Sequence, residues 1–359
     1  MSLQKQLRVL NNLMHVELPH YIIFYVTSQC NARCPHCFYW QQIESFDKSK
    51  ELTLEETQKI ANNFENLEQV SLTGGEPFLN DELPKICEIW SKTCNVSFFT
   101  IPTNGILSKR IAEKAEEIIT RCPSTHLRIG LSLDGVGEQH DRLRGIKGNF
   151  ANAMNTYAML DPLREKYSNI SIDVATVLQN GNQDNIVEIF EWVEKNLNVD
   201  NHMLLYPRGK PKEPRVKNVS LENYRKAHEF LKNRKMKDEH RPFSAVLRSV
   251  FEVSRDVIAQ TVEEERMIVP CTAGKRLIII GERGDVYPCE ILSECFGNLR
   301  DVNYDIRKLL FSQHGNDIKK FIKDTDCHCT FECAVNTNVV FSPRLYPKLA
   351  VRAVENIIG

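Results

Sequence analysis

The sequence predicts an α/β protein built on a partial (β/α)6 barrel, followed by a small region with a β-hairpin and helices. Three observations predict it: six apolar, β-branched runs, segments of helical period between them, and glycine-rich or polar turns directly after four of the runs. Strands alternating with helices imply a parallel sheet with right-handed crossovers. Six units are fewer than the eight of a closed barrel, so we expect an open barrel with its site at the carboxyl ends of the strands.

The first predicted strand, 21–27, runs directly into a cysteine-rich loop. Helical period is clearest at 53–67, where Thr53 and Glu56 fit a capping box, and at 108–119 and 183–197. The other predicted strands are 70–74, 96–102, 127–133, 170–178 and 202–207.

Charge and hydropathy limit the possible partners. Lys plus Arg (46) nearly balance Asp plus Glu (47), so nothing favours nucleic acid or a membrane surface as the main partner. No segment approaches the roughly 18 apolar residues of a membrane span, and the N-terminus lacks the apolar core of a signal peptide. We therefore expect a cytoplasmic protein. In that compartment twelve cysteines favour metal binding or redox chemistry over disulfides.

The loop after the first strand reads CNARCPHC and holds Cys30, Cys34 and Cys37. Iron-sulfur clusters are normally held by four cysteines, so three thiolates leave one iron open to a substrate or cofactor. The alternative is zinc with His36 or a distant residue as the fourth ligand, for which the loop would have to bend back sharply.

This loop, followed by an aromatic residue and by GGEP after the second strand, resembles the radical S-adenosylmethionine (SAM) superfamily. The resemblance implies a 4Fe-4S cluster on Cys30, Cys34 and Cys37 whose open iron chelates the amino and carboxylate groups of SAM. It further implies reductive cleavage of SAM to a 5′-deoxyadenosyl radical, which abstracts a hydrogen atom from a substrate carbon. A flavodoxin- or ferredoxin-type protein would donate the electron.

The same resemblance implies which residues contact SAM. The GGEP backbone would contact the methionyl amino group, with Glu76 as a supporting acceptor, and Arg144 would bind the carboxylate. Taken singly, most of these positions could also be ordinary turn residues. The implied set is Gly74, Gly75, Glu76, Pro77, Asn104, Ser132, Asp134 and Arg144.

A second cysteine group begins at Cys271, where RLIII, the turn GERGD and VYPC predict a β-hairpin. The pattern Cys-x17-Cys-Glu, with Gly297-Asn298 and a terminal cysteine cluster after it, resembles the SPASM auxiliary-cluster domain or its shorter twitch form. The terminal run departs from the full pattern, so we expect one auxiliary 4Fe-4S cluster rather than two. Cys295 is a less favoured ligand, and a structural zinc is the alternative. The expected ligands are Cys271 and Cys289, completed by two of Cys327, Cys329 and Cys333.

The chain divides into four expected parts. These are a radical SAM barrel (1–219), bridging helices (220–268), the auxiliary region (269–338) and a final helix (339–359) that packs back on the barrel. The basic stretch 206–217 is expected to be a solvated linker, with a phosphate or carboxylate site as the alternative. Cys87, Cys94 and Cys122 lie apart from both cysteine groups, and Cys87 fits a buried apolar face.

These features favour an oxidoreductase that passes the substrate radical's electron to the auxiliary cluster. Glu290 follows Cys289 where anaerobic sulfatase-maturating enzymes, which this arrangement resembles, carry an acidic residue proposed as a base. Only 29 residues precede Cys30, and none reads as a leader-peptide recognition module, so we expect a small molecule or short peptide as substrate.

Two alternatives remain. One is a peptide-modifying maturase, either a crosslinking enzyme or an epimerase with Cys295 as a candidate hydrogen donor. The other is a non-catalytic iron-sulfur electron carrier, which would have no reason to possess the GGEP and TNG turns.

Overall fold

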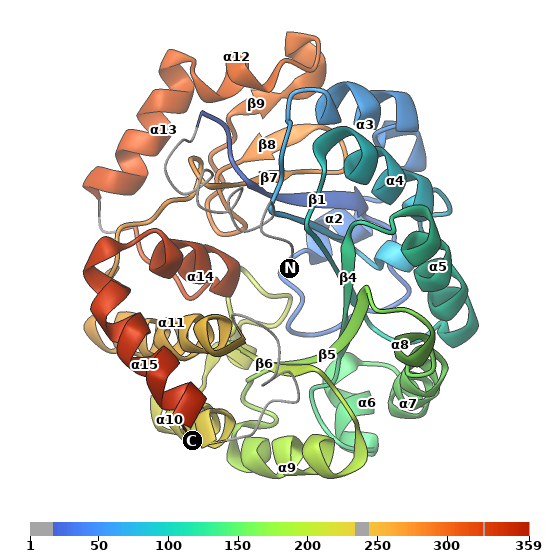
Figure 1. Cartoon of the computed structure of the whole chain (residues 1–359), viewed down its shortest axis with the longest axis vertical. Coiled ribbons are helices and arrows are strands. Elements are labelled where there is room, and N and C mark those ends of the chain that lie inside the picture. The colour runs from blue at the N-terminus through green and yellow to red at the C-terminus, as the bar shows by residue number, and fades with distance from the viewer. Residues whose placement is uncertain (1–16, 234–243, 326, 359) are drawn as a thin grey trace.

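A computed structural model describes residues 17–233, 244–325 and 327–358, and its centre is one open sheet of nine strands (Figure 1). Six parallel strands, β1 to β6, run in sequence order across most of it. The predicted partial barrel is confirmed, since β6 and β9 are the two edges of a sheet that does not close. The strands are β1 (Tyr21–Thr27), β2 (Gln69–Gly74), β3 (Phe98–Thr103), β4 (His126–Ser132), β5 (Ile170–Val177), β6 (Asn201–Leu205), β7 (Leu277–Ile280), β8 (Asp285–Tyr287) and β9 (Gly297–Asn298).

Helices between the strands cover the outer face of the sheet (Figure 1). The helix α3 begins with the predicted capping box, in which Thr53 Oγ1 accepts from the Glu56 N–H (3.2 Å) and the Glu56 carboxylate accepts from the Thr53 N–H (2.8 Å). The helices are α2 (Trp40–Glu44), α3 (Leu54–Ala61), α4 (Leu83–Cys94), α5 (Ser108–Arg121), α6 (Glu138–Arg144), α7 (Asn149–Leu160), α8 (Leu163–Lys166), α9 (Ile186–Asn196), α10 (Leu221–Asn233), α11 (Ser244–Glu264), α12 (Ile306–Leu310), α13 (Gln313–Asp324), α14 (Glu332–Val340) and α15 (Tyr346–Ile358).

The predicted hairpin is present as β7 and β8, and it extends the barrel sheet. The strand β7 pairs in parallel with β1, and β8 and β9 follow antiparallel. Ile23 and Tyr25 of β1 share a buried cluster with Leu277 and Ile279 of β7. This pairing brings the chain after β8, which carries Cys289 and Glu290, beside the strand that leads into the first cysteine loop.

The C-terminal helices pack against one another and against the β6 side of the barrel. Helices α14, α11 and α15 lie side by side (Figure 1), and Val253 and Val257 of α11 share a buried cluster with Val335 and Val339 of α14. The main contact of α15 is with α11, and Leu349 of α15 packs on a buried cluster that also holds Ile189 of α9 and Leu204 of β6. Among the described residues, no helix is long and apolar enough to cross a membrane.

Candidate active site

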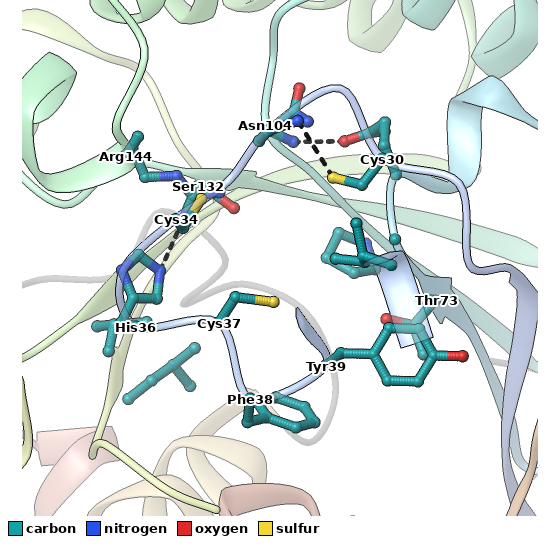
Figure 2. Close-up of a pocket in the computed structure, with 18 of the residues that line it drawn as sticks. Cys30, Cys34, His36, Cys37, Phe38, Tyr39, Thr73, Asn104, Ser132 and Arg144 are labelled. Atoms are coloured by element: carbon teal, nitrogen blue, oxygen red, sulfur yellow. Dashed lines mark hydrogen bonds between the residues drawn. The ribbon is translucent and has the colours of Figure 1, made fainter. Parts of the chain in front are cut away.

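A cavity of about 230 Å³ opens at the carboxyl ends of the barrel strands, where the site was predicted (Figure 2). Its walls come from the cysteine loop after β1, from the turns after β2 and β3, from the ends of β4 and β6, and from the loop after β8. Segments far apart in the sequence therefore meet around one space.

Cys30, Cys34 and Cys37 all line this cavity (Figure 2). A bond from the Cys37 N–H to the Cys34 carbonyl (3.1 Å) closes the end of the loop. Burial raises the pKa of the Cys30 thiol to about 12 and that of Cys37 to about 11. Thiols with such pKa values become metal ligands only when a cation displaces their protons.

Two segments hold the cysteine loop in place. From one side, the Lys212 N–H donates to the Cys37 carbonyl (3.0 Å) and the Glu213 N–H to the Pro35 carbonyl (2.9 Å). The basic stretch 206–217 thus supports the loop through its backbone, while Lys210, Lys212, Arg215 and Lys217 are exposed to solvent, as expected for a solvated linker.

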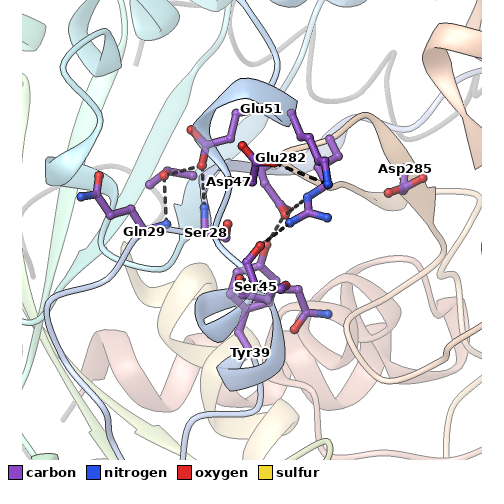
Figure 3. Close-up of polar contacts among 12 residues, drawn as sticks. Ser28, Gln29, Tyr39, Ser45, Asp47, Glu51, Glu282 and Asp285 are labelled. Atoms are coloured by element: carbon purple, nitrogen blue, oxygen red, sulfur yellow. Dashed lines mark hydrogen bonds and ion pairs between the residues drawn. The ribbon is translucent and has the colours of Figure 1, made fainter.

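From the other side, Glu51 Oε1 accepts hydrogen bonds from Thr27 Oγ1 (2.6 Å) and the Ser28 N–H (2.9 Å) at the start of the loop (Figure 3). Tyr39, just after the loop, donates to the Glu282 carboxylate in the turn between β7 and β8. Sequence reasoning missed both carboxylates because their partners lie far away along the chain.

The GGEP turn packs directly on this loop. The Gly75 N–H donates to the Thr27 carbonyl (2.9 Å) and the Glu76 N–H to the Gln29 carbonyl (2.8 Å). A Cβ on Gly75 would lie 2.2 Å from the Gln29 oxygen, so no larger residue fits there without moving the loop. An ammonium group donates hydrogen bonds, so the turn can bind one only through its carbonyl oxygens.

Glu76 links the turns after β2 and β3. Its carboxylate accepts from Thr103 Oγ1 (2.9 Å) and from the Asn104 N–H (2.8 Å), and burial raises its pKa to about 7. Asn104 in turn donates from Nδ2 to Asn31 Oδ1 (2.8 Å) within the cysteine loop. Gly74, Gly75, Glu76 and Asn104 line the cavity, whereas Pro77 is buried at the start of the following turn and does not.

Arg144 and Ser132 also line the cavity, as predicted, but Asp134 does not. Asp134 is fully buried and accepts from Arg144 Nη1 (3.0 Å) and from the Val177 N–H (2.8 Å). The structure therefore places Asp134 as the residue that orients Arg144. The Arg144 Nε is buried without a hydrogen-bond partner among the described residues, which leaves this donor for a ligand.

His36 lies in the cysteine loop against Arg144. Its Nε2 is 3.2 Å from Arg144 Nη1 and its Nδ1 is 3.3 Å from Gln179 Nε2. Burial lowers the pKa of His36 to about 4, so the ring is neutral at neutral pH. Within the described ranges, no three His, Cys, Asp or Glu side chains converge closely enough to hold a single metal ion.

Glu290, the predicted base, lines the cavity from the auxiliary side. Its Oε1 accepts from the Tyr25 hydroxyl (2.8 Å) and its Oε2 from Arg208 Nη2 (2.8 Å). Arg208 Nη1 also donates to Glu332 Oε2 (2.7 Å). Tyr25 and Arg208 were missed by sequence reasoning. The sequence offered one signal for each residue. Tyr25 lies in the first predicted strand, and Arg208 directly follows the sixth.

The Arg208 guanidinium lies between two aromatic rings. Its carbon is 5.2 Å from the centre of the Phe38 ring, next to Cys37, and 4.7 Å from that of Phe331, between the terminal cysteines. One partly buried side chain therefore contacts residues adjoining both cysteine groups, and it fixes Glu290 between them.

The second cysteine group surrounds a small cavity of about 10 Å³ with apolar walls. Its thiols are Cys271, Cys289, Cys327 and Cys329; Cys333 does not line it. Arg208 is near enough to Cys333 to offset, in part, the rise in its thiol pKa that burial causes.

The remaining cysteines lie apart from both cavities. The Cys295 thiol donates to the Val286 carbonyl (3.3 Å) and accepts from the Gly297 N–H (3.3 Å), so it stabilises the turn between β8 and β9 and faces neither cavity. Cys87, Cys94 and Cys122 are buried in the hydrophobic core, as expected for Cys87.

Comparison with known proteins identifies the barrel. The family model for the radical SAM superfamily matches residues 24–193. The chain is 25% identical over 297 residues to the antilisterial bacteriocin subtilosin biosynthesis protein AlbA of Bacillus subtilis, a match that covers 80% of this chain and 59% of AlbA. It is 24% identical over 297 residues to the AdoMet-dependent heme synthase of Methanosarcina barkeri, covering 79% of this chain and 80% of the synthase. The chain thus spans less than two thirds of AlbA.

A solved structure, native anSMEcpe with bound AdoMet and Cp18Cys peptide, superimposes with a TM-score of 0.56 at 17% identity, covering 94% of this chain and 99% of that one. At this identity the likeness shows the fold. Residues 24–193, which hold the three-thiol loop and the strands β2 to β5, are therefore a radical SAM domain.

Proposed function

We propose that this protein is a radical SAM oxidoreductase that removes a hydrogen atom from a carbon of a peptide and passes a second electron to an auxiliary 4Fe-4S cluster. One observation carries the proposal. Three cysteines line a cavity of about 230 Å³, four others line one of about 10 Å³, and the Glu290 carboxylate lies between the two sets.

The residues around the open cavity fit a 4Fe-4S cluster and SAM. Cys30, Cys34 and Cys37 would hold the cluster and leave one iron without a thiol. The buried and unpartnered Arg144 Nε would donate to the SAM carboxylate, with Asp134 holding the guanidinium in position. When bound, the cluster and SAM supply a 5′-deoxyadenosyl radical.

Carbonyls of the GGEP turn would accept from the methionyl amino group. Asn104 and Ser132, which also face the cavity, would contact the methionyl or ribose part. Because Glu76 bonds to the Asn104 N–H, it acts by fixing that turn.

Glu290 is proposed as the proton acceptor. Arg208 and the Tyr25 hydroxyl each donate to one oxygen of this carboxylate and so fix its direction. After a hydrogen atom leaves the substrate carbon, Glu290 would accept a proton, and a cluster held by the second cysteine group would supply the acceptor for one electron. The substrate thereby loses two hydrogens in all, as a new double bond or a bond to a neighbouring atom forms.

The auxiliary cluster is proposed on Cys271, Cys289, Cys327 and Cys329, because these four thiols line one cavity. Cys333, also considered as a ligand, lies outside it. A cluster needs more room than about 10 Å³, so its assembly has to move the side chains of this cavity outward. With its irons held by four thiolates, it would exchange electrons and bind no substrate.

A peptide is the proposed substrate class for two reasons. AlbA is a bacteriocin biosynthesis protein, and the superimposed structure holds a peptide. The heme synthase relative raises a tetrapyrrole as the alternative. A cavity of about 230 Å³ is smaller than the roughly 300–1,000 Å³ of most ligand sites, so a macrocycle beside SAM would be crowded, whereas a peptide can insert a single side chain.

The epimerase alternative lacks a hydrogen donor at its expected place, since the Cys295 thiol faces away from the cavity. We propose that the protein works in the reducing cytoplasm, where clustered thiols stay available for iron. A flavodoxin- or ferredoxin-type protein is the proposed electron donor.

The test is anaerobic reconstitution of the wild type and of the Cys30→Ala, Cys34→Ala, Cys37→Ala triple variant, with iron counted and 5′-deoxyadenosine assayed under dithionite and SAM. We expect about eight irons in the wild type and about four in the variant, with nucleoside only from the wild type. A wild type that forms no nucleoside contradicts the radical chemistry. A variant without iron contradicts the auxiliary cluster.

A further inference from the structure

The edge of the three-thiol cavity carries exposed basic side chains. The segment 206–208 lines the cavity, and the chain then continues along its edge. A Cβ on Gly209 would lie 3.1 Å from the Cβ of Phe38, which lines the cavity directly after Cys37 (Figure 2). The stretch 209–217 therefore borders the opening of the cavity.

Two basic side chains of this stretch are already paired with carboxylates. Lys212 Nζ lies 3.0 Å from Glu44 Oε1. Arg215 Nη2 lies 2.7 Å from Glu213 Oε2. These two cations therefore have little charge left to offer another molecule.

Three other cations near the opening have no carboxylate partner among the described residues. They are Arg33, Lys210 and Lys217, all exposed, and we call them the rim cations. Lys217 Nζ donates to the Gly209 carbonyl (3.3 Å). Arg33 Nη1 donates to the carbonyl of Cys30, which lines the cavity (2.8 Å). Carbonyl partners hold these two side chains in place without neutralising them.

The size of the cavity explains why these charges matter for a peptide. A volume of about 230 Å³ has room for one side chain beside SAM, so the residues on either side of that position must lie outside, over the opening. There they meet the rim cations. Exposed charges without partners attract opposite charge, and the carboxylates of Asp and Glu are the acidic side chains of a peptide.

We propose that the rim cations select a peptide whose residues next to the reacting position are acidic. The inference rests on the peptide substrate proposed above and narrows it. An acidic electron-donor protein is the other molecule that such a surface could hold. The peptide is favoured because the Lys217 ammonium lies beside Gly209, which packs against a residue of the cavity wall.

The experiment uses the reconstituted full chain, with its clusters checked by electron paramagnetic resonance (EPR) spectroscopy. Two fluorescent peptides share one sequence except beside the central residue, where one carries Asp and Glu and the other carries Asn and Gln. Dissociation constants are measured by fluorescence anisotropy in low salt and in high salt. We expect the acidic peptide to bind more tightly, and high salt to remove most of the difference.

Single charge reversals identify the residues. In Lys210→Glu and in Lys217→Glu we expect the Kd of the acidic peptide to rise about 5-fold, with that of the amide peptide unchanged. Because the Lys210 side chain is exposed, its reversal should leave the fold intact. The matched control is Lys195→Glu, an exposed lysine near the end of α9, which changes the net charge equally and should change neither Kd.

Equal binding of the two peptides by the wild type overturns the inference, as does an equal loss of affinity in the Lys195→Glu control. If the Lys210 and Lys217 variants weaken the binding of an acidic flavodoxin and leave that of the acidic peptide unchanged, the surface serves the electron donor and the inference is wrong. Formation of 5′-deoxyadenosine is assayed on the same samples, so the radical chemistry and the peptide selection can fail separately.

Discussion

The two cysteine sites differ in their number of thiols and in what surrounds them. Three thiols face a cavity of about 230 Å³ whose walls also carry Arg144, Asn104 and Ser132. Four thiols surround about 10 Å³ with apolar walls. An iron that lacks a thiol needs space and polar partners for another ligand, and a fully ligated cluster needs neither. The surroundings of each site therefore agree with its number of thiols. They fit the proposed division, in which one site carries out the chemistry and the other would store an electron.

The residues between the two sites contact both of them. Arg208 contacts Phe38 and Phe331, and it holds Glu290 at the edge of the open cavity. The proposed proton acceptor would thus lie beside a substrate that meets a radical on one side and loses an electron on the other.

Loss of a single thiol from the second cysteine group is expected to have the largest effect, and it tests whether the two sites work separately. In Cys289→Ala we expect about four fewer irons per chain, with 5′-deoxyadenosine formation from SAM retained. The matched control is Cys295→Ser, whose thiol stabilises a turn and should keep all the iron. Loss of nucleoside formation in Cys289→Ala, in protein that keeps the first cluster, would mean that the two sites do not work separately.

A methyl group on Gly75 tests whether the position of the cysteine loop matters at the three-thiol site. Its Cβ would lie 2.2 Å from the Gln29 oxygen, so Gly75→Ala must displace the cysteine loop. A displacement of this kind can cost about 100-fold in rate, and we expect such a fall in nucleoside formation with the auxiliary EPR signal unchanged. Gly130→Ala, where the nearest atoms are 3.7 Å from the new Cβ, is the control. Equal rates of nucleoside formation in the two variants would contradict the proposal that the GGEP turn holds the cysteine loop in place.

Arg144→Met removes the proposed donor to the SAM carboxylate. A hydrogen bond to a charged group contributes about 2 kcal/mol, so the Kd for SAM should rise about 30-fold by equilibrium binding. Arg144→Lys keeps the charge and loses the fork of donors, and should fall between Met and wild type. A Met variant that binds SAM as tightly as the wild type would remove Arg144 from the site.

The smallest expected effect lies where the two regions are joined, at Glu56 of α3. Its carboxylate pairs with Arg300, which follows β9 (2.6 Å). Hydrogen bonding to Arg300 lowers the pKa of Glu56 to about 2 from 4.5. The pair therefore stabilises the fold fully above pH 4.5, and this contribution is lost as the pH falls from 4.5 to about 2.

We expect Glu56→Gln to lower the free energy of unfolding by about 1 kcal/mol at pH 7, measured by urea denaturation. The difference from wild type should shrink at low pH. Glu55→Gln, on the same turn but paired with Lys59 at the surface, is the control. A difference that persists unchanged at pH 3 would contradict the role of the ion pair.

Much of the open site could be predicted from the sequence because its signals are local. The strands, the capping box at Thr53, the three clustered thiols and the glycines of GGEP are each visible within a few residues. Arg144 and Asn104 followed from the resemblance, and the structure places both at the cavity.

The parts that could not be predicted depend on contacts between distant segments. The pairing of β7 with β1 joins strands more than 250 residues apart, and it decides that Glu290 meets Tyr25. No local pattern distinguishes Asp134, which orients Arg144, from a residue that contacts a ligand. The choice of Cys327 and Cys329 over Cys333 likewise depends on how the chain before α14 folds back toward Cys271.

The most direct test of this account is EPR spectroscopy of the dithionite-reduced, reconstituted wild type before and after addition of SAM. The account predicts two overlapping 4Fe-4S signals, of which one changes with SAM because its open iron gains a ligand, while the other stays the same. The signal that stays should match the spectrum of the Cys30→Ala, Cys34→Ala, Cys37→Ala variant, which SAM should leave unaltered. A change in that variant's spectrum, or no change in the wild type, would contradict the division into an open and a closed site.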